Sequence, residues 1–349
     1  MISSRPFEHS GMTKIIMDIL LYNNTIDFTV ACGFEYGEYY VDFFKKNKIK
    51  YLELSSKKNV LKYMISIYKL VKRGNYNKVY IHGNSSMMIL EALPNKLCGI
   101  NVITHCHNTS SGKKTFIYKV LKPFFNLCVD CKIGCSNKAA KWAYNNKNVT
   151  VVLNGVDVDR FKYNPQKRRE VRKLLGVEGK KLVGHIGTFN RQKNHLKLIG
   201  VFEELLKLYP DSSLLLIGDG ELKRSVIQCI KDKEISDKVI FLDYISNPED
   251  YLQAMDIVIM PSLFEGFCLV ALEAQVSGLP VLVSDALPEE AVLTDNSKVL
   301  SLNASNQLWA ESALKLMKNK REDNSRCFKV KGLEYDSMLE KISKILLKD

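Results

Sequence analysis

The sequence predicts an α/β protein with two parallel, doubly wound domains. The first observation is the length, because 349 residues are enough for two domains with sizeable cores. The second is the alternation of short apolar runs with helical segments, which is typical of parallel sheets covered by helices. The third is the stretch 257–284, in which an apolar run, a glycine turn, a helical segment and a second apolar run make a strand–turn–helix–strand unit.

The first half of the chain contains strand-length apolar runs separated by helical segments. Residues 1–4 form the weakest expected strand, because only two apolar residues precede Arg5 and Pro6 and a buried parallel strand usually has about four to eight. A glycine-containing loop, residues 7–13, leads into a helix at about 14–21. The later expected strands are 27–32, 50–54, 78–82 and 102–106, and the expected helices are 59–72, 87–93 and 116–127.

The second half repeats this alternation after a polar, basic run at 164–173, which is expected to bridge to the second domain. The expected strands are 181–186, 213–217, 239–243, 257–260, 281–284 and 299–302. Helices are expected at 248–256 and from Trp309 onward, and residues 333–347 have the apolar spacing of an amphipathic helix.

Residues 261–284 carry the strongest functional signal. Gly266 allows a tight turn into the helix, and the first helical turn at 267–269 presents free N–H groups and the positive end of a dipole, which accept an anion such as a diphosphate. Glu265 and Glu273 lie eight residues apart, about two turns at roughly 3.6 residues per turn, so both can face one cleft. Carboxylates are good acceptors for sugar hydroxyls. The alternative is an ordinary glutamate before a helix and a solvated glutamate within it.

This stretch resembles the Glu-x7-Glu element of glycosyltransferase family 4, whose members are retaining enzymes of the GT-B fold. The matching residues are Pro261, Ser262, Glu265, Gly266, Phe267, Leu269, Glu273, Ala274, Gly278, Pro280 and Val281. The resemblance implies that Glu265 addresses the donor sugar, that Glu273 addresses the nucleotide ribose, and that the amides of residues 267–269 hold the diphosphate. Cys268 departs from the family, which usually has glycine or a similarly small residue there, and it is expected to narrow the space beside the donor.

The resemblance also implies the domain organisation: two Rossmann-like domains that face each other across a cleft. Residues 1–160 would bind the acceptor and residues 165–330 the nucleotide-sugar donor, and a C-terminal helix at about 333–349 would pack back on the first domain. Asp157 and Asp159 form a D-x-D pattern that could hold a divalent cation. Because the surrounding residues resemble the connector between the two domains of the family, no metal is expected there.

The loop after the strand at 181–186 resembles the family's grip on the donor diphosphate, which uses an arginine and a lysine. Lys193 matches the lysine. Thr188, next to Gly187, stands at the arginine position, and Arg191 is expected to supply the missing charge. Cations are needed because the leaving nucleotide diphosphate gains negative charge as the glycosidic bond breaks.

Two glycines, Gly218 and Gly220, follow the strand at 213–217. They are a weak sign of an NAD site, since the third glycine of that pattern is missing. The resemblance places Gly218 against the nucleotide instead, and it implies that the strand around Phe241 touches the base through its backbone.

In the first half, residues 104–109 reach the carboxyl edge of the expected sheet, where α/β proteins bind ligands. The resemblance assigns His107, in preference to His105, to the loop that orients the donor sugar. Gly11 matches one glycine of a Gly-Gly loop that lines the cleft in the family. Ser136 is expected to cap the following helix.

The cysteines and the apolar runs bear on cofactors and location. Nine cysteines, an odd number, in a chain without a signal peptide favour reduced thiols. Cys128, Cys131 and Cys135 could suggest zinc, but no second cluster completes four ligands, so buried thiols are favoured. No apolar run approaches the roughly 18 residues of a membrane span. We expect a cytoplasmic protein, at most at the inner face of the membrane, with no cofactor and no metal.

The positive charge is concentrated in the first half of the chain. Residues 1–160 hold 23 Lys and Arg against 11 Asp and Glu, whereas residues 161–349 hold 28 against 27. An anionic partner, such as a membrane surface or a lipid diphosphate, would explain the excess, and so would a lysine-rich proteome; no nucleic-acid-binding pattern accompanies it. The segment 59–72 fits either a helix on an anionic membrane or an ordinary packed surface helix.

Together these features predict a retaining glycosyltransferase. It would move a hexose or N-acetylhexosamine from a nucleotide-diphosphate sugar, with UDP as the expected nucleotide, to a lipid-linked or oligosaccharide acceptor in bacterial surface polysaccharide synthesis. Two other interpretations stay open: a non-catalytic GT-B accessory subunit, which the short first strand and Thr188 favour, and a GT-B sugar-nucleotide epimerase.

Overall fold

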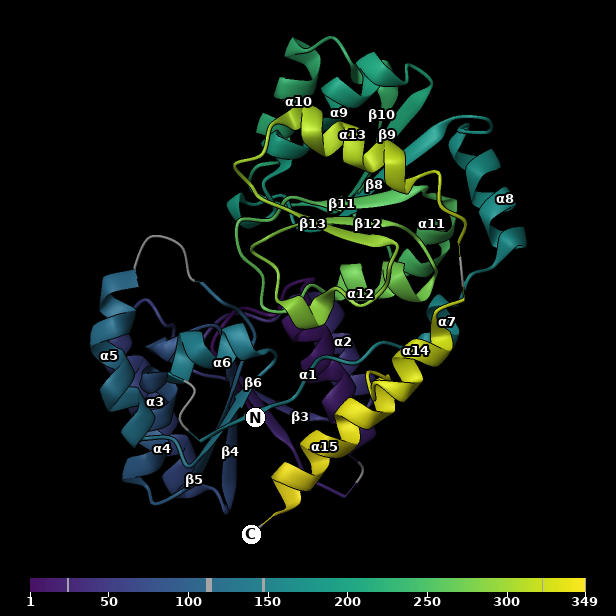
Figure 1. Ribbon diagram of the computed structural model, residues 1–349. Helices are drawn as coiled ribbons and strands as arrows, with labels where there is room; N and C mark the ends of the chain where they lie inside the picture. Colours follow the sequence, from purple (N-terminus) through teal and green to yellow (C-terminus); the bar gives the residue numbers. More distant parts are fainter. Residues whose placement is uncertain (24, 111–114, 146–147, 322, 349) are drawn as a thin grey trace. The chain divides into compact units, whose positions relative to one another are not determined.

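The computed structural model describes residues 1–349 except 24, 111–114, 146–147, 322 and 349. The chain divides into two units, each built around its own sheet (Figure 1). Unit 1 comprises Met1–Leu153 and Met338–Asp349, and unit 2 comprises Asn154–Ser337. The predicted fold class, two Rossmann-like parallel sheets with helices, is confirmed.

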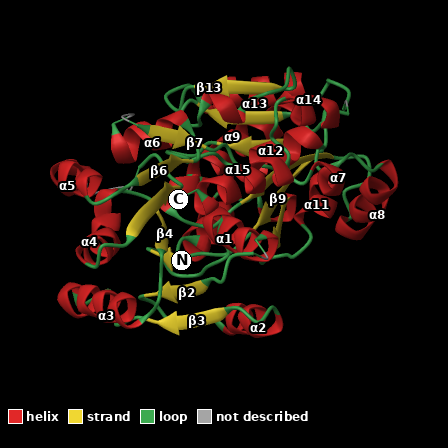
Figure 2. Cartoon of the chain, turned by 90° about the horizontal axis from the view of Figure 1, so that it is seen from below, coloured by secondary structure: helices red, strands yellow, loops and turns green. Residues whose placement is uncertain are grey.

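The sheet of unit 1 has the strand order β3-β2-β1-β4-β5-β6-β7, and neighbouring strands are parallel. Its strands are β1 (Ile2–Ser3), β2 (Thr29–Cys32), β3 (Lys50–Glu53), β4 (Lys78–Gly83), β5 (Asn101–Cys106), β6 (Cys131–Gly134) and β7 (Val149–Val151). Figure 2 shows β3 and β2 at one edge, with the N-terminus beside β2. The short first strand is nevertheless central, because Ile2 is paired with both Ala31 and Ile81.

Helices cover this sheet, and three of them begin at a serine or asparagine cap. The helices are α1 (Gly11–Tyr22), α2 (Glu38–Lys46), α3 (Val60–Arg73), α4 (Ile89–Leu97), α5 (Thr115–Leu127) and α6 (Asn137–Tyr144), with a 3-10 turn η1 (Ser86–Met88). The Ser136 hydroxyl accepts a hydrogen bond from the Ala139 N–H at 3.1 Å, so its predicted capping role is confirmed. Helix α3 buries Tyr63, Ile67 and Val71, as a packed surface helix does.

The expected loop around Gly11 is wrong. Gly11 is the first residue of α1, and Ser10 is the residue that caps this helix, through the N–H of Thr13 at 3.3 Å. The helix therefore starts three residues earlier than the sequence pattern indicated, because a serine three positions before Thr13 satisfies the free N–H groups of the first turn. Gly11 is a helical residue and does not form part of a glycine-rich loop.

The sheet of unit 2 has the order β10-β9-β8-β11-β12-β13 and is also parallel. Its strands are β8 (Lys181–Ile186), β9 (Ser212–Ile217), β10 (Val239–Leu242), β11 (Ile257–Met260), β12 (Val281–Ser284) and β13 (Ser297–Leu300). The chain builds outward from β8 to β10 and then returns to place β11 on the other side of β8. The point between β8 and β11, where the strand order reverses, is where sheets of this kind bind ligands.

Both faces of the second sheet are covered by helices. The helices are α7 (Val158–Phe161), α8 (Pro165–Leu175), α9 (His195–Leu208), α10 (Lys223–Asp232), α11 (Pro248–Ala254), α12 (Leu269–Val276), α13 (Asn306–Leu316) and α14 (Ser325–Val330), with 3-10 turns η3 (Arg191–Lys193), η4 (Ser236–Lys238) and η5 (Glu289–Ala291). In Figure 1, α9, α10 and α13 lie on one side of the strands and α12 lies on the other. The core on the first side joins Phe202, Ile257 and Trp309, all fully buried.

The connector sequence belongs to unit 2, although residues up to 160 were expected in the first domain. Asp157 caps α7 by accepting a hydrogen bond from the Arg160 N–H at 3.0 Å. Its carboxylate thus has a structural role in the turn. The last helix, α15 (Tyr335–Leu347), lies mostly in unit 1, where Ser343 donates a hydrogen bond to Asn23.

Among the described residues, no helix is long and apolar enough to cross a membrane.

Candidate functional site

Two loops border the point where the strand order of unit 2 reverses. One follows β8 and contains Gly187 to Asn194, and the other follows β11 and contains Pro261 to Cys268. The Leu263 N–H donates to the Gln192 carbonyl at 2.8 Å, and the Asn194 side-chain amide donates to the Pro261 carbonyl at 3.1 Å. These bonds join the loops into one continuous edge, so residues about 70 positions apart in the sequence share a site.

The structure pairs the two predicted groups of opposite charge in these loops. The Lys193 ammonium lies 2.7 Å from Oε1 of Glu265, and the Gln192 amide donates to Oε2 at 3.1 Å. The two charged side chains are only 15% and 6% exposed. Burial alone would lower the pKa of Lys193, but the neighbouring Glu265 carboxylate outweighs this and raises it, so the lysine stays charged. Lys193 and Glu265 therefore form a buried ion pair at the carboxyl edge of the sheet.

Two polar neighbours of this pair were not predicted. Gln192 holds the second oxygen of Glu265, and the Asn190 side chain accepts a hydrogen bond from the Lys193 N–H at 3.2 Å. Both lie in the same short loop as Lys193, and a search for polar side chains flanking the lysine would have found them. They fix the backbone that carries the lysine.

The helix start behind Glu265 has an unusual backbone. Cys268 is the N-cap residue of α12 and adopts φ 70° and ψ 76°, in the left-handed region that favours glycine. This conformation explains why glycine suits the position. The thiol is buried, and burial together with the negative charge of Glu265 raises its pKa to about 12. The N-cap residue Cys268 makes no side-chain capping hydrogen bond to α12.

Glu273 lies within α12, where its side chain is nearly as buried as that of Glu265. Both carboxylates raise the pKa of Cys268, which places that residue within electrostatic range of the two. Glu273 also contributes to raising the pKa of Arg160, after the larger effect of the Glu249 hydrogen bond. Glu265 and Lys193 thus lie in the loops beside the start of α12, and Glu273 lies within that helix.

The glycines after β8 and β9 bring two backbones unusually close. Gly218 has φ +138°, and a Cβ atom there would lie 2.3 Å from the Gly187 carbonyl oxygen. The Gly218 N–H donates to the Leu242 carbonyl at 3.0 Å, which ties the end of the Phe241 strand to the same edge. The Phe241 side chain itself packs against the core with Phe189. Only glycine lets two backbones approach this closely.

Thr188 and Arg191 are the other two residues at the predicted diphosphate site. Thr188 is half-buried and brings no charge. Arg191 is exposed at the start of η3, and it forms no ion pair with a residue of the described chain. Of the two predicted cations, only Lys193 is held by this fold.

In unit 1, three histidines meet at the carboxyl edge of β4 and β5. His107 follows β5, and its Nε2 lies 2.9 Å from Nδ1 of His82 at the end of β4. His105 is fully buried and bonds the Tyr80 hydroxyl at 2.8 Å, whereas His107 is partly exposed. Burial lowers the pKa of His107 to about 3, so this imidazole is neutral.

One nitrogen from each of these histidines lies within 4.8 Å of the others, so the cluster could hold a metal ion. Neither the cysteine nor the aspartate patterns of the sequence indicated this group. The signal was present, because His105 lies in β5, His107 directly follows that strand, and His82 of the neighbouring β4 is paired with His105.

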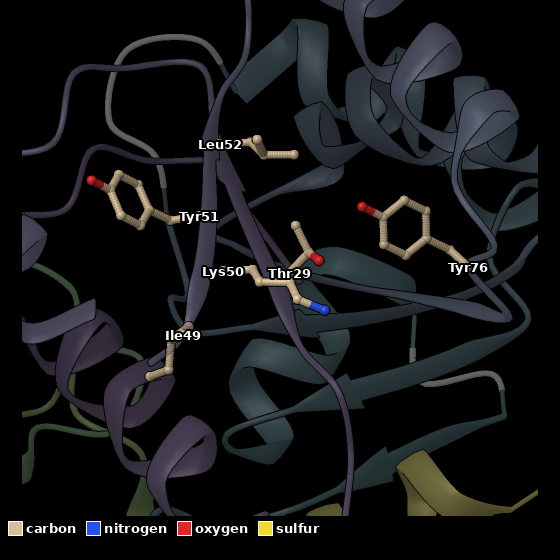
Figure 3. Close-up of a pocket in the computed structure, with 6 residues that line it drawn as sticks. All are labelled: Thr29, Ile49, Lys50, Tyr51, Leu52 and Tyr76. Atoms are coloured by element: carbon tan, nitrogen blue, oxygen red, sulfur yellow. The ribbon is translucent and has the colours of Figure 1, made fainter. Parts of the chain in front are cut away.

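A shallow hollow of about 380 Å³ lies at the opposite end of the unit 1 strands, and Figure 3 shows the residues that line it. It is lined by the first residues of β2 and β3, Thr29 and Lys50, together with Ile49, Tyr51, Leu52 and Tyr76. Because ligands of parallel sheets bind at the carboxyl ends, this hollow does not belong to the candidate site.

Comparison with known proteins identifies the family. Residues 166–329, most of unit 2, match the family described as "Glycosyl transferases group 1". A Bacillus subtilis protein named as a glycosyltransferase, EpsF, is 27% identical over 316 residues, which cover 86% of this chain and 79% of that protein. An Escherichia coli UDP-Gal:alpha-D-GlcNAc-diphosphoundecaprenol alpha-1,3-galactosyltransferase is 30% identical over 240 residues, 64% of this chain and 62% of the relative.

Solved structures show the same fold over the whole chain. The crystal structure of Anabaena HepE in complex with UDP-glucose has a TM-score of 0.83, with 17% identity over 99% of this chain and 98% of that one. The two sheets, the named relatives and the family match agree: the chain is a glycosyltransferase of the GT-B fold, and its residues 166–329 match the group 1 glycosyl transferases.

Proposed function

We propose that this enzyme transfers a hexose or N-acetylhexosamine, with retention of configuration, from a UDP-sugar to a lipid-linked saccharide during bacterial surface polysaccharide synthesis. The observation that carries the proposal is the buried Lys193–Glu265 pair beside the start of α12 and the close approach of Gly218 and Gly187. The names of the relatives support the substrates: one is a galactosyltransferase that uses UDP-Gal and a diphosphoundecaprenol acceptor, and Anabaena HepE was solved with UDP-glucose.

In the proposed complex, the donor diphosphate lies against the N–H groups at the start of α12 and against Lys193. Glu273 accepts hydrogen bonds from the ribose hydroxyls, and Glu265 accepts hydrogen bonds from the sugar. The diphosphate competes with Glu265 for the ammonium of Lys193, which frees the carboxylate to bind hydroxyl groups. Arg191, exposed on η3, can swing toward the same phosphates.

The proposed reaction is a front-face substitution. The bond between the anomeric carbon and the diphosphate oxygen breaks, and the electron pair leaves with UDP. The acceptor hydroxyl oxygen bonds to the same face of the anomeric carbon, and its proton passes to the departing diphosphate. Lys193, Arg191 and the dipole of α12 stabilise the charge that develops on UDP, and the proposal uses no metal. His107 of unit 1, neutral at physiological pH, would orient the sugar by hydrogen bonding.

Replacing Glu273 by alanine should weaken UDP binding about ten- to a hundredfold, because a charge-assisted hydrogen bond to the ribose contributes about 1.5–3 kcal/mol. Isothermal titration calorimetry with UDP would measure this. A suitable control is Glu311→Ala, since Glu311 is an exposed carboxylate on α13 whose partner is Gln307. Equal UDP affinity in Glu273→Ala and the wild-type protein would contradict the ribose role.

Replacing Gly218 by alanine should reduce UDP binding at least as strongly, because the new Cβ would lie 2.3 Å from the Gly187 carbonyl oxygen and would push the two loops apart. Gly179→Ala is the matched control, since Gly179 also has a positive φ, +80°, but nothing lies within 4 Å of the added carbon. If both variants bind UDP equally well, the close backbone approach does not shape the nucleotide site.

A further inference from the structure

A basic hollow lies between α5 and α6 in unit 1, and the proposed function assigns it no role. Its volume is about 420 Å³, and four of its lining residues are lysines: Lys119 and Lys122 from α5, and Lys138 and Lys141 from α6. No aspartate or glutamate is among the described residues that line it. Four ammonium groups around one hollow repel one another, and an anion with more than one negative charge would relieve that repulsion.

Hydrogen bonds hold the elements that carry these lysines together. Lys122 donates to the Lys141 carbonyl at 3.2 Å and to the Asn145 side-chain oxygen at 2.9 Å, which holds α5 against α6. Burial, together with the nearby Lys119, lowers the pKa of Lys122. The Trp142 indole N–H donates to the Asn84 carbonyl at 2.8 Å and fixes the ring in the lining.

The hollow lies at the functional edge of the unit 1 sheet. Thr109, part of its lining, follows His107 by two residues, and Asn84 directly follows β4. A ligand in the hollow would thus be close in the fold to the histidine proposed to orient the donor sugar.

Helix α5 adds an exposed apolar stripe beside the lysines. Phe116, Val120, Phe124 and Leu127 recur at helical spacing and are 78%, 49%, 59% and 78% exposed. The opposite side of the helix carries the fully buried Phe125. Figure 1 shows α5 next to α4 and α6, with its outer side uncovered by other elements of unit 1. An amphipathic helix of this kind normally turns its apolar side inward, so the stripe indicates contact with something apolar.

We propose that the α5–α6 hollow binds the diphosphate of a lipid-linked acceptor and that the hydrocarbon chain of the same molecule lies along the apolar stripe of α5. The four lysines complement the diphosphate, and the stripe residues Phe116, Val120 and Phe124 alternate with Lys119 and Lys122 along α5. A single amphiphile, anionic at one end and apolar at the other, fits both features. The inference rests on the proposed function, because it names the acceptor of that reaction, and it places the acceptor in unit 1.

Farnesyl diphosphate is a soluble probe that has both a diphosphate and a hydrocarbon chain. Calorimetry with the protein in saturating UDP measures the binding of this probe outside the donor site, because UDP occupies the donor site. The double variant Lys119→Gln/Lys141→Gln should weaken its binding at least about tenfold, since each charged hydrogen bond contributes severalfold or more. Phe116→Ser/Phe124→Ser should weaken farnesyl diphosphate severalfold and leave inorganic diphosphate unchanged, because it removes only apolar contacts. Lys62→Gln/Lys69→Gln on α3, two exposed lysines outside the hollow, is the matched control.

Three results would overturn the inference. One is farnesyl diphosphate binding that falls equally in the α3 control, which would indicate general charge attraction. Another is binding unaffected by the α5–α6 variants. The third is a wild-type protein that binds phosphatidylglycerol vesicles but not farnesyl diphosphate, with vesicle binding lost in Phe116→Ser/Phe124→Ser. The apolar stripe would then contact a lipid bilayer. UDP titration of the same variants in the absence of added UDP tests the donor site separately, so failure of the donor site is distinguishable from failure of this site.

Discussion

Replacing Lys193 by glutamine should lower the turnover of sugar transfer about 10²–10³-fold at saturating donor, which is the usual cost of removing one group that stabilises charge in a transition state. The ammonium lies 2.7 Å from Glu265 and is almost out of solvent. A buried cation acts more strongly than an exposed one, because water screens it less. Steady-state kinetics with a UDP-sugar and a lipid-linked acceptor would measure the loss.

The Lys193 substitution removes a charge, and its effect must be distinguished from a disturbed fold. Glutamine keeps a donor for Glu265, so the buried carboxylate is not left without a hydrogen bond. Lys197→Gln is the control, because Lys197 is on α9 in the same unit, a few residues away, and donates only to the Ala304 carbonyl. The reading of Lys193 as the phosphate cation fails if Lys193→Gln folds, binds UDP and turns over like Lys197→Gln.

Much of the second sheet could be predicted because its strands are continuous apolar runs bounded by polar residues. The strands β8, β11 and β12 have the predicted bounds, and all of their central residues are buried on both faces. Such runs fit only a buried parallel strand at this length. The two-residue strand β1 was recognised as weak, and it holds its central place through pairing partners that its own sequence does not indicate.

The sequence was less informative wherever tertiary contacts decide the local structure. The pairing of Lys193 with Glu265 depends on two loops that meet only in the folded sheet. The left-handed backbone conformation of Cys268 could not be predicted from the sequence, because cysteine rarely adopts that conformation. The segment 59–72 could suit membrane contact by its periodicity, and α3 does expose Leu61 and Ile65. The exposed apolar side chains of α5 were not foreseen, because packing and not periodicity decides which sides of a helix face a neighbour.

The second large effect concerns stability and a network in unit 2. Asp256 directly precedes β11, and its carboxylate accepts hydrogen bonds from Arg168 at 2.6 Å, Arg172 at 3.2 Å and the Leu182 N–H at 2.7 Å. The two arginines also donate to backbone carbonyls at the end of α11, including those of Gln253 and Ala254. The carboxylate therefore balances two partly buried charges that cap a helix and fasten α8 to β8.

Asp256→Asn should destabilise unit 2 by about 3–5 kcal/mol, because removing one partner of a buried ion pair leaves the other charges without compensation. Glu170→Gln is the matched control on α8, since Glu170 pairs with Lys167 at the exposed surface, and it should leave the melting temperature unchanged. Hydrogen exchange of the β8 and β11 amides would locate the loss in unit 2. Equal protection in Asp256→Asn and Glu170→Gln would contradict the structural role of the network.

The pH dependence gives an independent check on the same carboxylate. Burial alone would raise the pKa of Asp256, but Arg168, the Leu182 N–H and Arg172 together hold it below its usual range. A carboxyl group whose pKa is lower in the folded state contributes stability that is fully present above its unfolded value, about 3.9, and that is lost as the pH falls through the folded value. The difference in unfolding free energy between wild type and Asp256→Asn should thus stay constant from neutral pH to about pH 5 and shrink below about pH 4. A difference that persists unchanged at lower pH would mean that the side chain stabilises unit 2 through its shape and hydrogen bonds, and not through its charge.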